Sequence, residues 1–393
     1  MPVQSEQAKT YRGAGIKSMS PHLPSEVSRV VIDLTKLKVM HCGLGQFCLH
    51  LGRALVSASS PYYIPEFLVP SNRRQLLADY EEHLICARPW MQESFLRHAR
   101  PWLSRFLPEV PRCALWHATT QFVRYLPLDD RIPVVQTIHD LSFLQLKSPK
   151  KCERYLRRMQ KLMDRAAAVT TISQFVADEV RKHLDLRGKP LYVVYNGLIA
   201  EDYPDAAKPD FMDERPFLFT IGDITPKKNF HVLVSLLRLL PQYRLVIAGN
   251  TGTKYAQEIG RLAASSGVSD RVIMPGIITD ATRCWMYKNC AAFLFPSISE
   301  GFGLPVIEAM RFGKAVFLSD ATSLPEIGGP LAFYWRSFSA EHMLEMFNTG
   351  MAAYSADSTY PARLVARARQ FSWDRTAAEY VAIYRKVLGN VRA

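Results

Sequence analysis

The sequence predicts an α/β protein with two domains, each built around a parallel sheet. Its 393 residues exceed what one ordinary hydrophobic core organises and suit two domains. Hydrophobic residues make up 48% and charged residues 22%, which is typical of a soluble globular protein. Short apolar runs alternate with helical patterns along the chain, and this alternation is typical of βα units and parallel sheets.

Apolar runs of strand length mark the expected sheets. In the first half, strands are expected at residues 29–34, 114–117, 133–138, 168–172 and 191–195. In the second half, they are expected at residues 217–221, 244–248, 272–274, 291–295 and 315–318. Helices are expected between them, as at residues 230–240 and 255–264.

A break between the domains is expected at residues 201–214 (EDYPDAAKPDFMDE). This stretch holds six acidic residues and two prolines, and both features oppose a packed element. We therefore expect a flexible tail at 1–27, a first domain at 28–200, a linker at 201–214 and a second domain at 215–370. The last helix, about 373–387, opens the segment 371–393, a candidate for crossing back to the first domain.

The charge and the cysteines constrain partners and compartment. Residues 1–200 hold 28 Lys and Arg against 17 Asp and Glu, a net of +11, while the rest of the chain carries +2. This asymmetry favours an anionic partner on the N-terminal side: nucleic acid, anionic lipid or a phosphate-bearing acceptor. There is no secretory h-region and no apolar stretch long enough to span a membrane. Seven cysteines without a CxxC pair fit free thiols, so we expect a cytoplasmic protein.

The segment 299–310 (SEGFGLPVIEAM) is the strongest functional signal. An apolar strand runs into a glycine loop, and Pro305 in the first turn suits the start of a helix. Gly301 and Gly303 allow close approach of a ligand, and the free N–H groups of the helix form a phosphate site. Glu300 in the loop and Glu308, expected in the first helical turn, are acceptors for sugar hydroxyls.

A second strand-to-helix junction, 221–230 (IGDITPKKNF), places two lysines at a helix start. Lysine opposes the helix dipole there, so Lys227 and Lys228 make sense if a diphosphate neutralises them. A solvated lysine pair is the alternative. Gly222 and Pro226 shape the turn.

Two weaker motifs follow strands of the first domain. Residues 42–50 (CGLGQFCLH) hold Gly43 and Gly45 between a strand and a helix, where a simple turn is an equal interpretation. His139 and Asp140 end another strand, at the edge where open sheets bind ligands. A structural His–Asp hydrogen bond is the alternative, and we expect Asp140 to orient the loop.

Together these motifs resemble the retaining glycosyltransferases of family 4. The string 299–310 matches that family's E-x7-E signature, and 42–50 resembles its glycine loop. Lys228 aligns with the lysine of its G-R-x-x-x-x-K pattern, whereas Asp223 stands where the family has arginine. Shorter resemblances lie at residues 170–175, 195–197, 319–328 and 371–373, so the likeness spans roughly residues 28–390. Within that family, the mannosyltransferase-like members that take part in bacterial surface-polysaccharide synthesis most resemble this sequence.

The resemblance implies a GT-B architecture, in which two Rossmann-like domains with parallel sheets face each other across a cleft. It implies transfer with retention from a nucleotide diphosphate-sugar, best GDP-mannose, to a glycan or lipid-linked acceptor, with no cofactor and no metal. A UDP-sugar donor, carrying glucose or N-acetylglucosamine, is the alternative. The implied catalytic residues are Glu300, His139 and Lys228. The implied donor-binding residues are Gly43, Gly45, Gly222, Lys227, Lys228, Asn229, Gly301, Phe302, Gly303, Leu304 and Glu308.

Two other functions fit the sequence less well. A glycoside hydrolase using Glu300 and Glu308 is disfavoured, because a loop-to-helix segment poorly suits two carboxylates facing across one bond. A nonenzymatic nucleic-acid-binding protein would fit the charge, but no binding motif is recognisable and no specific nucleic acid is expected. The basic aromatic stretch 88–106 and the cluster 150–165 are candidates for peripheral contact with an anionic membrane, with packing on the first domain an equal interpretation.

Overall fold

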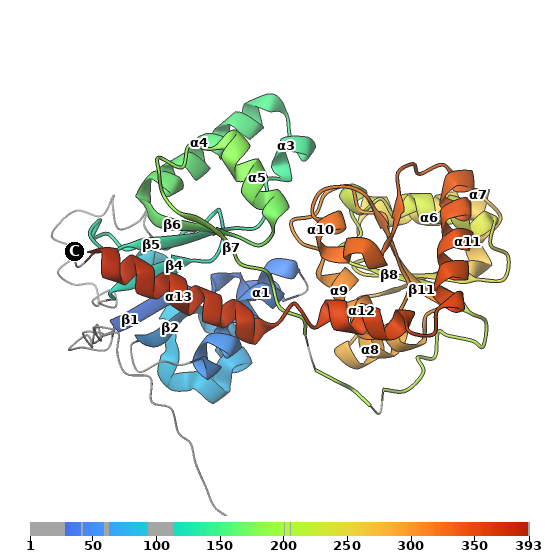
Figure 1. Cartoon of the computed structure of the whole chain (residues 1–393), viewed down its shortest axis with the longest axis horizontal. Coiled ribbons are helices and arrows are strands. Elements are labelled where there is room, and N and C mark those ends of the chain that lie inside the picture. Colours follow the sequence, from blue (N-terminus) through green and yellow to red (C-terminus); the bar gives the residue numbers. More distant parts are fainter. Residues whose placement is uncertain are drawn as a thin grey trace, which may run out of the picture.

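Two parallel sheets organise the protein, as the alternation of apolar runs and helical patterns predicts. The computed structural model describes residues 28–40, 42–58, 63–92, 113–199, 201–204 and 206–391. The two sheets form separate bodies that lie next to each other (Figure 1). The expected tail 1–27 and most of the segment 88–106 lie outside the described residues.

The N-terminal body contains a sheet of seven described strands in the order β3-β2-β1-β4-β5-β6-β7, with all neighbours parallel. Its strands are β1 (Ser28–Asp33), β2 (Tyr63–Pro70), β3 (Leu84–Ala87), β4 (Leu115–Ala118), β5 (Val134–Ile138), β6 (Ala166–Thr171) and β7 (Leu191–Val193). Its helices are α1 (Gly43–Ser57), α3 (Phe143–Leu146), α4 (Pro149–Arg165) and α5 (Gln174–His183). Short 3-10 helices lie at Thr35–Lys38, Ser71–His83 and Pro89–Met91.

The C-terminal body repeats this plan with six described strands in the order β10-β9-β8-β11-β12-β13, again parallel. Its strands are β8 (Phe217–Ile221), β9 (Arg244–Ala248), β10 (Val272–Gly276), β11 (Ala292–Phe295), β12 (Val316–Ser319) and β13 (Phe333–Trp335). Its helices are α6 (His231–Arg238), α7 (Lys254–Ser265), α8 (Asp280–Asn289), α9 (Leu304–Arg311), α10 (Leu324–Gly328), α11 (Ala340–Ala356) and α12 (Tyr360–Ala368). Its 3-10 helices are Pro226–Lys228, Ser269–Arg271 and Gly329–Leu331.

Side-chain caps fix where several helices begin. A Ser or Thr precedes each of these helices, and its hydroxyl accepts a backbone N–H of the first turn, which stabilises a helix start by about 1 kcal/mol. The capping residues are Ser173 for α5, Thr253 for α7, Thr279 for α8 and Ser339 for α11.

In each sheet the strand order reverses between the first strand and the fourth. These switch points lie between β1 and β4 in one sheet and between β8 and β11 in the other. Loops leaving the carboxyl ends of such strand pairs diverge, and the crevice between them is where open α/β sheets bind ligands. The topology therefore provides one binding crevice in each body.

Three observed strands were not predicted. β2 contains Pro65 and Pro70, and proline argues against a central strand because it cannot donate to the ladder. Even so, β2 lies between β1 and β3, and Pro65 is in register with Val30. β3 and β13 have four and three residues and lie at sheet edges, so their apolar pattern is too short to recognise.

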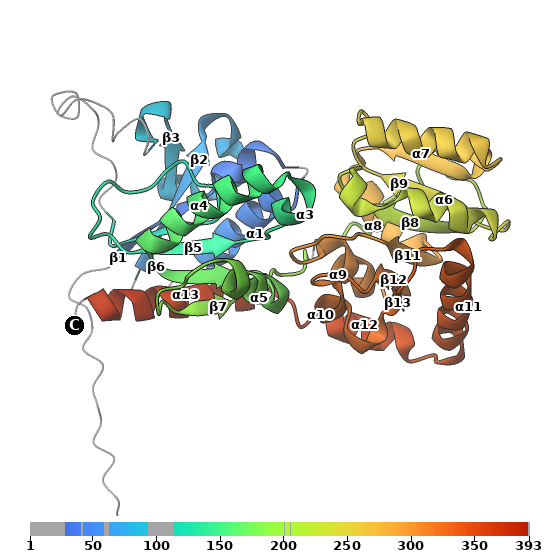
Figure 2. The same ribbon diagram turned by 90° about the horizontal axis from the view of Figure 1, so that it is seen from above.

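The last helix, α13 (Trp373–Val391), belongs to the N-terminal body although it follows the C-terminal one in sequence (Figures 1 and 2). It packs against α1. The hydroxyl of Tyr384 lies 2.7 Å from Nδ1 of buried His117, and the hydroxyl of Tyr380 lies 3.1 Å from Oγ1 of Thr137. The two crossing segments are also joined, because Leu198 N donates to Phe371 O at 2.9 Å.

A carboxylate of one body caps a helix of the other. Glu326, on α10, accepts the backbone N–H groups of Gln174 (2.7 Å) and Phe175 (3.0 Å), the first residues of α5. Beside it, the hydroxyl of Ser173 donates to Gly301 O at 2.7 Å. An anionic side chain at a helix N-terminus is stabilising, so this contact holds the two bodies together along one side of the cleft.

We expect Glu326→Ala to favour an open arrangement of the two bodies, because two N–H groups of α5 lose their acceptors. The loss of a helix cap costs about 1 kcal/mol. Small-angle X-ray scattering should show a larger radius of gyration than for the wild type. Glu341→Ala removes an equal charge from α11 and is the matched control. Identical scattering of wild type and Glu326→Ala would show that this contact does not hold the two bodies together.

Candidate active site

A cavity of about 380 Å³ lies where the two bodies meet, and residues of both line it. From the N-terminal body it takes the start of α1 and the loop after β5. From the C-terminal body it takes the loops after β8 and β11. The predicted site residues that line it are Gly43, His139, Gly222, Lys227, Lys228, Gly301, Phe302, Gly303, Leu304, Glu300 and Glu308.

Glycines bring the two walls of this cavity into direct contact. A Cβ on Gly301 would lie 2.0 Å from the carbonyl oxygen of His139, so no side chain fits at this point of the interface. Gly303 precedes α9 with φ of 109°, a left-handed conformation that favours glycine. The N-terminus of α9 thus borders the cavity, where its dipole and the N–H of Leu304 suit an anion, whereas Pro305 has no N–H and Val306 N donates to Gly303 O at 2.9 Å.

Lys228 and Glu300 form a close ion pair in the wall of the C-terminal body. Lys228 Nζ donates to Glu300 Oε1 at 2.6 Å, and each side chain is only 11% exposed. The same oxygen accepts the hydroxyl of Ser297 at 2.6 Å, and Lys228 Nζ lies 4.8 Å from the ring centre of Phe295. Two residues 72 positions apart are therefore fixed beside one another, next to the N-terminus of α9.

Glu308 lies deeper on α9 than the sequence suggested. It is the fifth residue of the helix, in the second turn, because α9 begins at Leu304 rather than later. The side chain is buried, and its Oε2 accepts the hydroxyl of Tyr287 at 2.8 Å. Burial, with the carboxylate of Glu308 adding to it, raises the pKa of Tyr287 well above its usual value, so Tyr287 stays a donor.

His139 presents a neutral ring at the N-terminal wall. Its Nε2 lies 2.8 Å from the carbonyl oxygen of Thr119, which can only accept, so Nε2 carries the proton and Nδ1 is the acceptor. Phe47 packs edge-on against the ring at 4.6 Å. Burial lowers the pKa of His139 to about 4, so the ring is uncharged at neutral pH. The adjacent Asp140 accepts the backbone N–H and the hydroxyl of Ser142, which orders the loop.

Two predicted residues do not line the cavity. Gly45 lies inside α1, where a Cβ would be 2.1 Å from the Val39 carbonyl oxygen, so it serves packing of the preceding loop. Asn229 adopts a left-handed conformation with φ of 56° after the 3-10 turn Pro226–Lys228 and is buried. Both positions shape the backbone beside the site.

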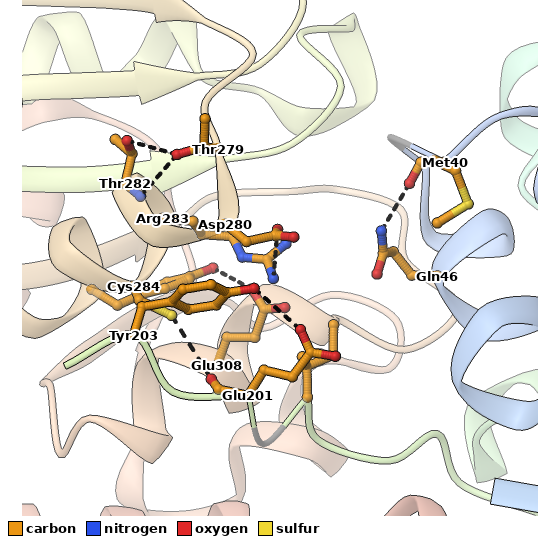
Figure 3. A network of polar contacts seen from close by, with 12 residues as sticks. Met40, Gln46, Glu201, Tyr203, Thr279, Asp280, Thr282, Arg283, Cys284 and Glu308 are labelled. Carbon is orange, nitrogen blue, oxygen red and sulfur yellow. Dashed lines mark hydrogen bonds and ion pairs between the residues drawn. The ribbon is translucent and has the colours of Figure 1, made fainter. Parts of the chain in front are cut away.

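Arg283, on α8, lines the cavity beside Glu308 and was not predicted from the sequence. Its guanidinium forms an ion pair with the exposed carboxylate of Asp280, with the nearest N and O atoms 3.1 Å apart. Figure 3 shows this pair at the cleft, with Glu308 on one side and Gln46 of the N-terminal body across from it. The Thr279 cap followed by Asp280 and Arg283 one turn apart was the available signal, but nothing in the sequence links it to Glu308, 25 positions later.

Fewer cationic side chains than carboxylates line this cavity. Lys227, Lys228 and Arg283 face four lining carboxylates, which belong to Asp140, Asp223, Glu300 and Glu308. The three cations and the N-terminus of α9 favour an anion, so each cation matters for binding one. Among the residues that the structure describes, no group of three or more His, Cys, Asp or Glu is placed to hold a metal ion. All seven cysteines are free thiols.

Sequence profiles of known families match both halves of the chain. Residues 43–202 match the profile described as Glycosyltransferase Family 4, and residues 204–371 match Glycosyl transferases group 1.

Individual proteins resemble the chain as well. It is 30% identical over 269 residues to the serotype-specific mannosyltransferase WbdA of Escherichia coli. The aligned region covers 63% of this chain and 33% of WbdA. It is 25% identical over 267 residues to the O-antigen chain mannosyltransferase B of Escherichia coli, covering 64% and 70%. The chain spans about a third of the length of the first curated relatives it matches. Anabaena HepE, solved with UDP-glucose, has the same fold with a TM-score of 0.69 and 18% identity over 90% of this chain and 99% of that one.

We expect stability to fall as the pH decreases from 6.5 to 4, in part because of His139. Over this range the unfolded histidine takes up a proton that the buried ring does not, so the unfolded state is favoured by up to about 1.4 kcal/mol per pH unit. Urea unfolding at pH 7, 6 and 5 should show a shallower loss for His139→Gln than for the wild type. Equal losses in both proteins would contradict a neutral, buried His139.

We expect Arg283→Ala to weaken the binding of inorganic pyrophosphate, because the cavity then keeps two cations against its four carboxylates. A hydrogen bond to a charged group contributes about 1.5–3 kcal/mol, so the dissociation constant should rise at least about tenfold. Isothermal titration calorimetry measures it. Arg261→Ala, at an exposed position of α7, is the matched control. Unchanged affinity in Arg283→Ala would place this guanidinium outside the anion site.

Proposed function

Because this chain belongs to the glycosyltransferases, with a family 4 N-terminal part and a group 1 C-terminal part, we propose that it transfers a hexosyl group from a nucleotide diphosphate-sugar. The acceptor is a glycan or lipid-linked saccharide of bacterial surface polysaccharide or lipopolysaccharide synthesis. The donor is GDP-mannose. The support for mannose is the likeness to WbdA and to the O-antigen chain mannosyltransferase B.

One observation supports this proposal above the others: the Lys228–Glu300 pair lies beside the N-terminus of α9 in a cavity between two parallel sheets. A diphosphate needs amide donors and a cation, and a sugar needs hydroxyl acceptors. The cavity supplies both within one wall. The donor therefore binds mainly to the C-terminal body.

Each residue has a distinct part in this arrangement. The N-terminus of α9, Lys228 and Arg283 hold the diphosphate, and Lys228 stabilises the charge that grows on it as the glycosidic bond breaks. Glu308, held by Tyr287, accepts ribose hydroxyls. Glu300 accepts hydroxyls of the transferred sugar. His139 lies across the cavity, and its Nδ1 is an acceptor for another sugar hydroxyl.

The transfer keeps the configuration at the anomeric carbon. The bond from the anomeric carbon to the phosphate oxygen breaks, and the acceptor oxygen forms its bond on the same face. The departing phosphate oxygen takes the acceptor proton, so no protein base is needed. No metal takes part. Contact of the two bodies at Gly301 and His139 excludes water from the reacting atoms and limits hydrolysis.

The acceptor approaches from the N-terminal body, which carries the excess positive charge. We place the protein in the cytoplasm with peripheral contact to the anionic inner face of the membrane, through exposed basic residues of α4 such as Lys150, Lys151 and Arg154. No helix in the described part of the chain has the length and apolar character that crossing a bilayer requires. No specific nucleic acid is a partner.

A donor screen tests this function. We expect GDP-mannose to raise the melting temperature in a thermal-shift assay, and UDP-glucose and UDP-N-acetylglucosamine at the same concentration to raise it less, because a ligand that binds more tightly stabilises the folded state more. A larger shift with a UDP-sugar would replace GDP-mannose by that donor. If none of these donors nor their free diphosphates shifts the transition, the proposed function is wrong.

Two variants in the same assay assign the residues. Lys228→Ala and Glu308→Gln should keep the native fold and lose most of the donor-induced shift and of the transfer activity. Lys228→Ala should also have a lower melting temperature without ligand, because Glu300 loses its ion-pair partner. Lys288→Ala, at an exposed position of α8, is the matched control. Wild-type transfer by either site variant would remove that residue from the proposed machinery.

A further inference from the structure

A second and larger cavity, about 680 Å³, lies in the N-terminal body. Its walls are the segments that leave the carboxyl ends of β1, β2, β3 and β4, so it occupies the crevice at the β1–β4 switch point. Open α/β sheets bind ligands in such crevices. Cys42 and Leu44 line both this cavity and the one that contains Glu300, so the two cavities adjoin.

The charge of this second cavity is one-sided. Among the residues that the structure describes, three cations line it, those of Lys36, Lys38 and Arg124, and no Asp or Glu does. The donor cavity, by contrast, has four lining carboxylates. None of the three cations has a hydrogen-bond or ion-pair partner for its charged group within the described part of the chain. Three like charges around one hollow repel each other unless an anion joins them.

Lys36 connects this charge to the reaction centre. Its side chain is half-buried and belongs to the second residue of the 3-10 helix Thr35–Lys38, which closely follows β1. Burial is the main influence on the pKa of His139, which it lowers, and on that of Asp33, which it raises. The ammonium group of Lys36 adds a smaller lowering influence on both, so it lies within Coulombic reach of His139.

The rest of the lining suits a ligand that is partly sugar and partly apolar. Hydroxyl and amide groups of Ser71, Asn72 and Gln92 can exchange hydrogen bonds with saccharide hydroxyls. Phe122 and Tyr125 offer aromatic faces, and Val39 is 54% exposed at the same cavity. Neutral saccharide alone would leave the three cations without a counter-charge.

We propose that this cavity binds a phosphate group carried by the acceptor substrate, through Lys36, Lys38 and Arg124. The proposal rests on the proposed function, because it defines the acceptor of that reaction. Arg124 suits phosphate through its fork of N–H donors, and the lysines suit it as point charges. The phosphate is that of a sugar phosphate or of an isoprenoid phosphate, and the chemistry of recognition is the same for both.

Three probes test the proposal on the full chain by isothermal titration calorimetry: α-mannose 1-phosphate, farnesyl phosphate and methyl α-mannoside. The first two carry phosphate on a sugar and on an isoprenoid chain, and the third is the neutral counterpart of the first. We expect at least one phosphate probe to bind at least tenfold more tightly than methyl α-mannoside. Which phosphate binds more tightly identifies the source.

Variants separate this cavity from the donor cavity, which also attracts phosphate. Lys36→Gln combined with Arg124→Gln should weaken the phosphate probe at least tenfold. The matched control, Lys254→Gln combined with Arg261→Gln, removes the same charge from exposed positions of α7 in the C-terminal body and should bind as the wild type does. Circular dichroism confirms folding, which neither change should affect because no described contact of these charged groups is lost.

The proposal is overturned if the Lys36/Arg124 variant binds the phosphate probes as tightly as the control does, or if the wild type binds no phosphate probe. If Lys228→Ala alone abolishes binding of the probes, the phosphate site is the donor cavity; the acceptor proposal fails while the proposed function stands. If no nucleotide-sugar binds but the Lys36/Arg124 variant still loses the phosphate probe, the proposed function fails and the phosphate site stands.

Discussion

The backbone contact between Gly301 and His139 determines how the two bodies meet. Any side chain at position 301 would lie 2.0 Å from the His139 carbonyl oxygen, so the loop after β11 and the end of β5 approach as closely as two backbones can. Ser173, which caps α5, donates to the carbonyl of the same glycine. The neutral histidine and the α9 N-terminus therefore face one cavity only because this one position lacks a side chain.

Electrostatics within that cavity follow from the pairing of Lys228 with Glu300. Ion pairs shielded from water are costly to desolvate, and removing one partner leaves the other uncompensated. Glu300 thereby keeps the Lys228 ammonium in place when no anion is bound. An entering diphosphate adds a second anion to a cation that is already positioned, so little reorganisation is needed.

Much of this architecture follows from local sequence patterns, and the exceptions have physical causes. The parallel sheets, the glycine loop before α9 and the positions of Lys228, Glu300 and His139 at strand ends could be predicted, because each depends on residues adjacent in sequence. β2 could not, since its prolines contradict the strand pattern. Arg283 could not either, because its place beside Glu308 arises only when α8 and α9 pack together.

Two further differences between prediction and structure concern Gly45 and Glu308, which were assigned to the site from the family resemblance. Gly45 aligns with a glycine of the family's ligand-binding loop. In this chain, however, the position that a Cβ would take points at the carbonyl oxygen of Val39 in the same body, and not into the cavity. Glu308 aligns with the second glutamate of the signature. Which helical turn contains it depends on where α9 begins, and the left-handed conformation of Gly303 fixes that beginning at Leu304. Motif spacing identifies which residues belong to a site, whereas tertiary contacts decide which of their atoms face it.

The return of α13 to the N-terminal body has a consequence for synthesis of the chain. Tyr380 and Tyr384 complete the hydrogen bonds of Thr137 and His117, both buried in the first sheet. A ribosome adds roughly 5–20 residues per second, so about 180 residues, or some ten to thirty-five seconds, separate the end of β7 from the arrival of α13. During that interval the surface of α1 that α13 later covers is open, and His117 lacks its hydrogen-bond partner Tyr384. The N-terminal body is therefore synthesised first but completes its packing last, because α13 is made after the C-terminal body.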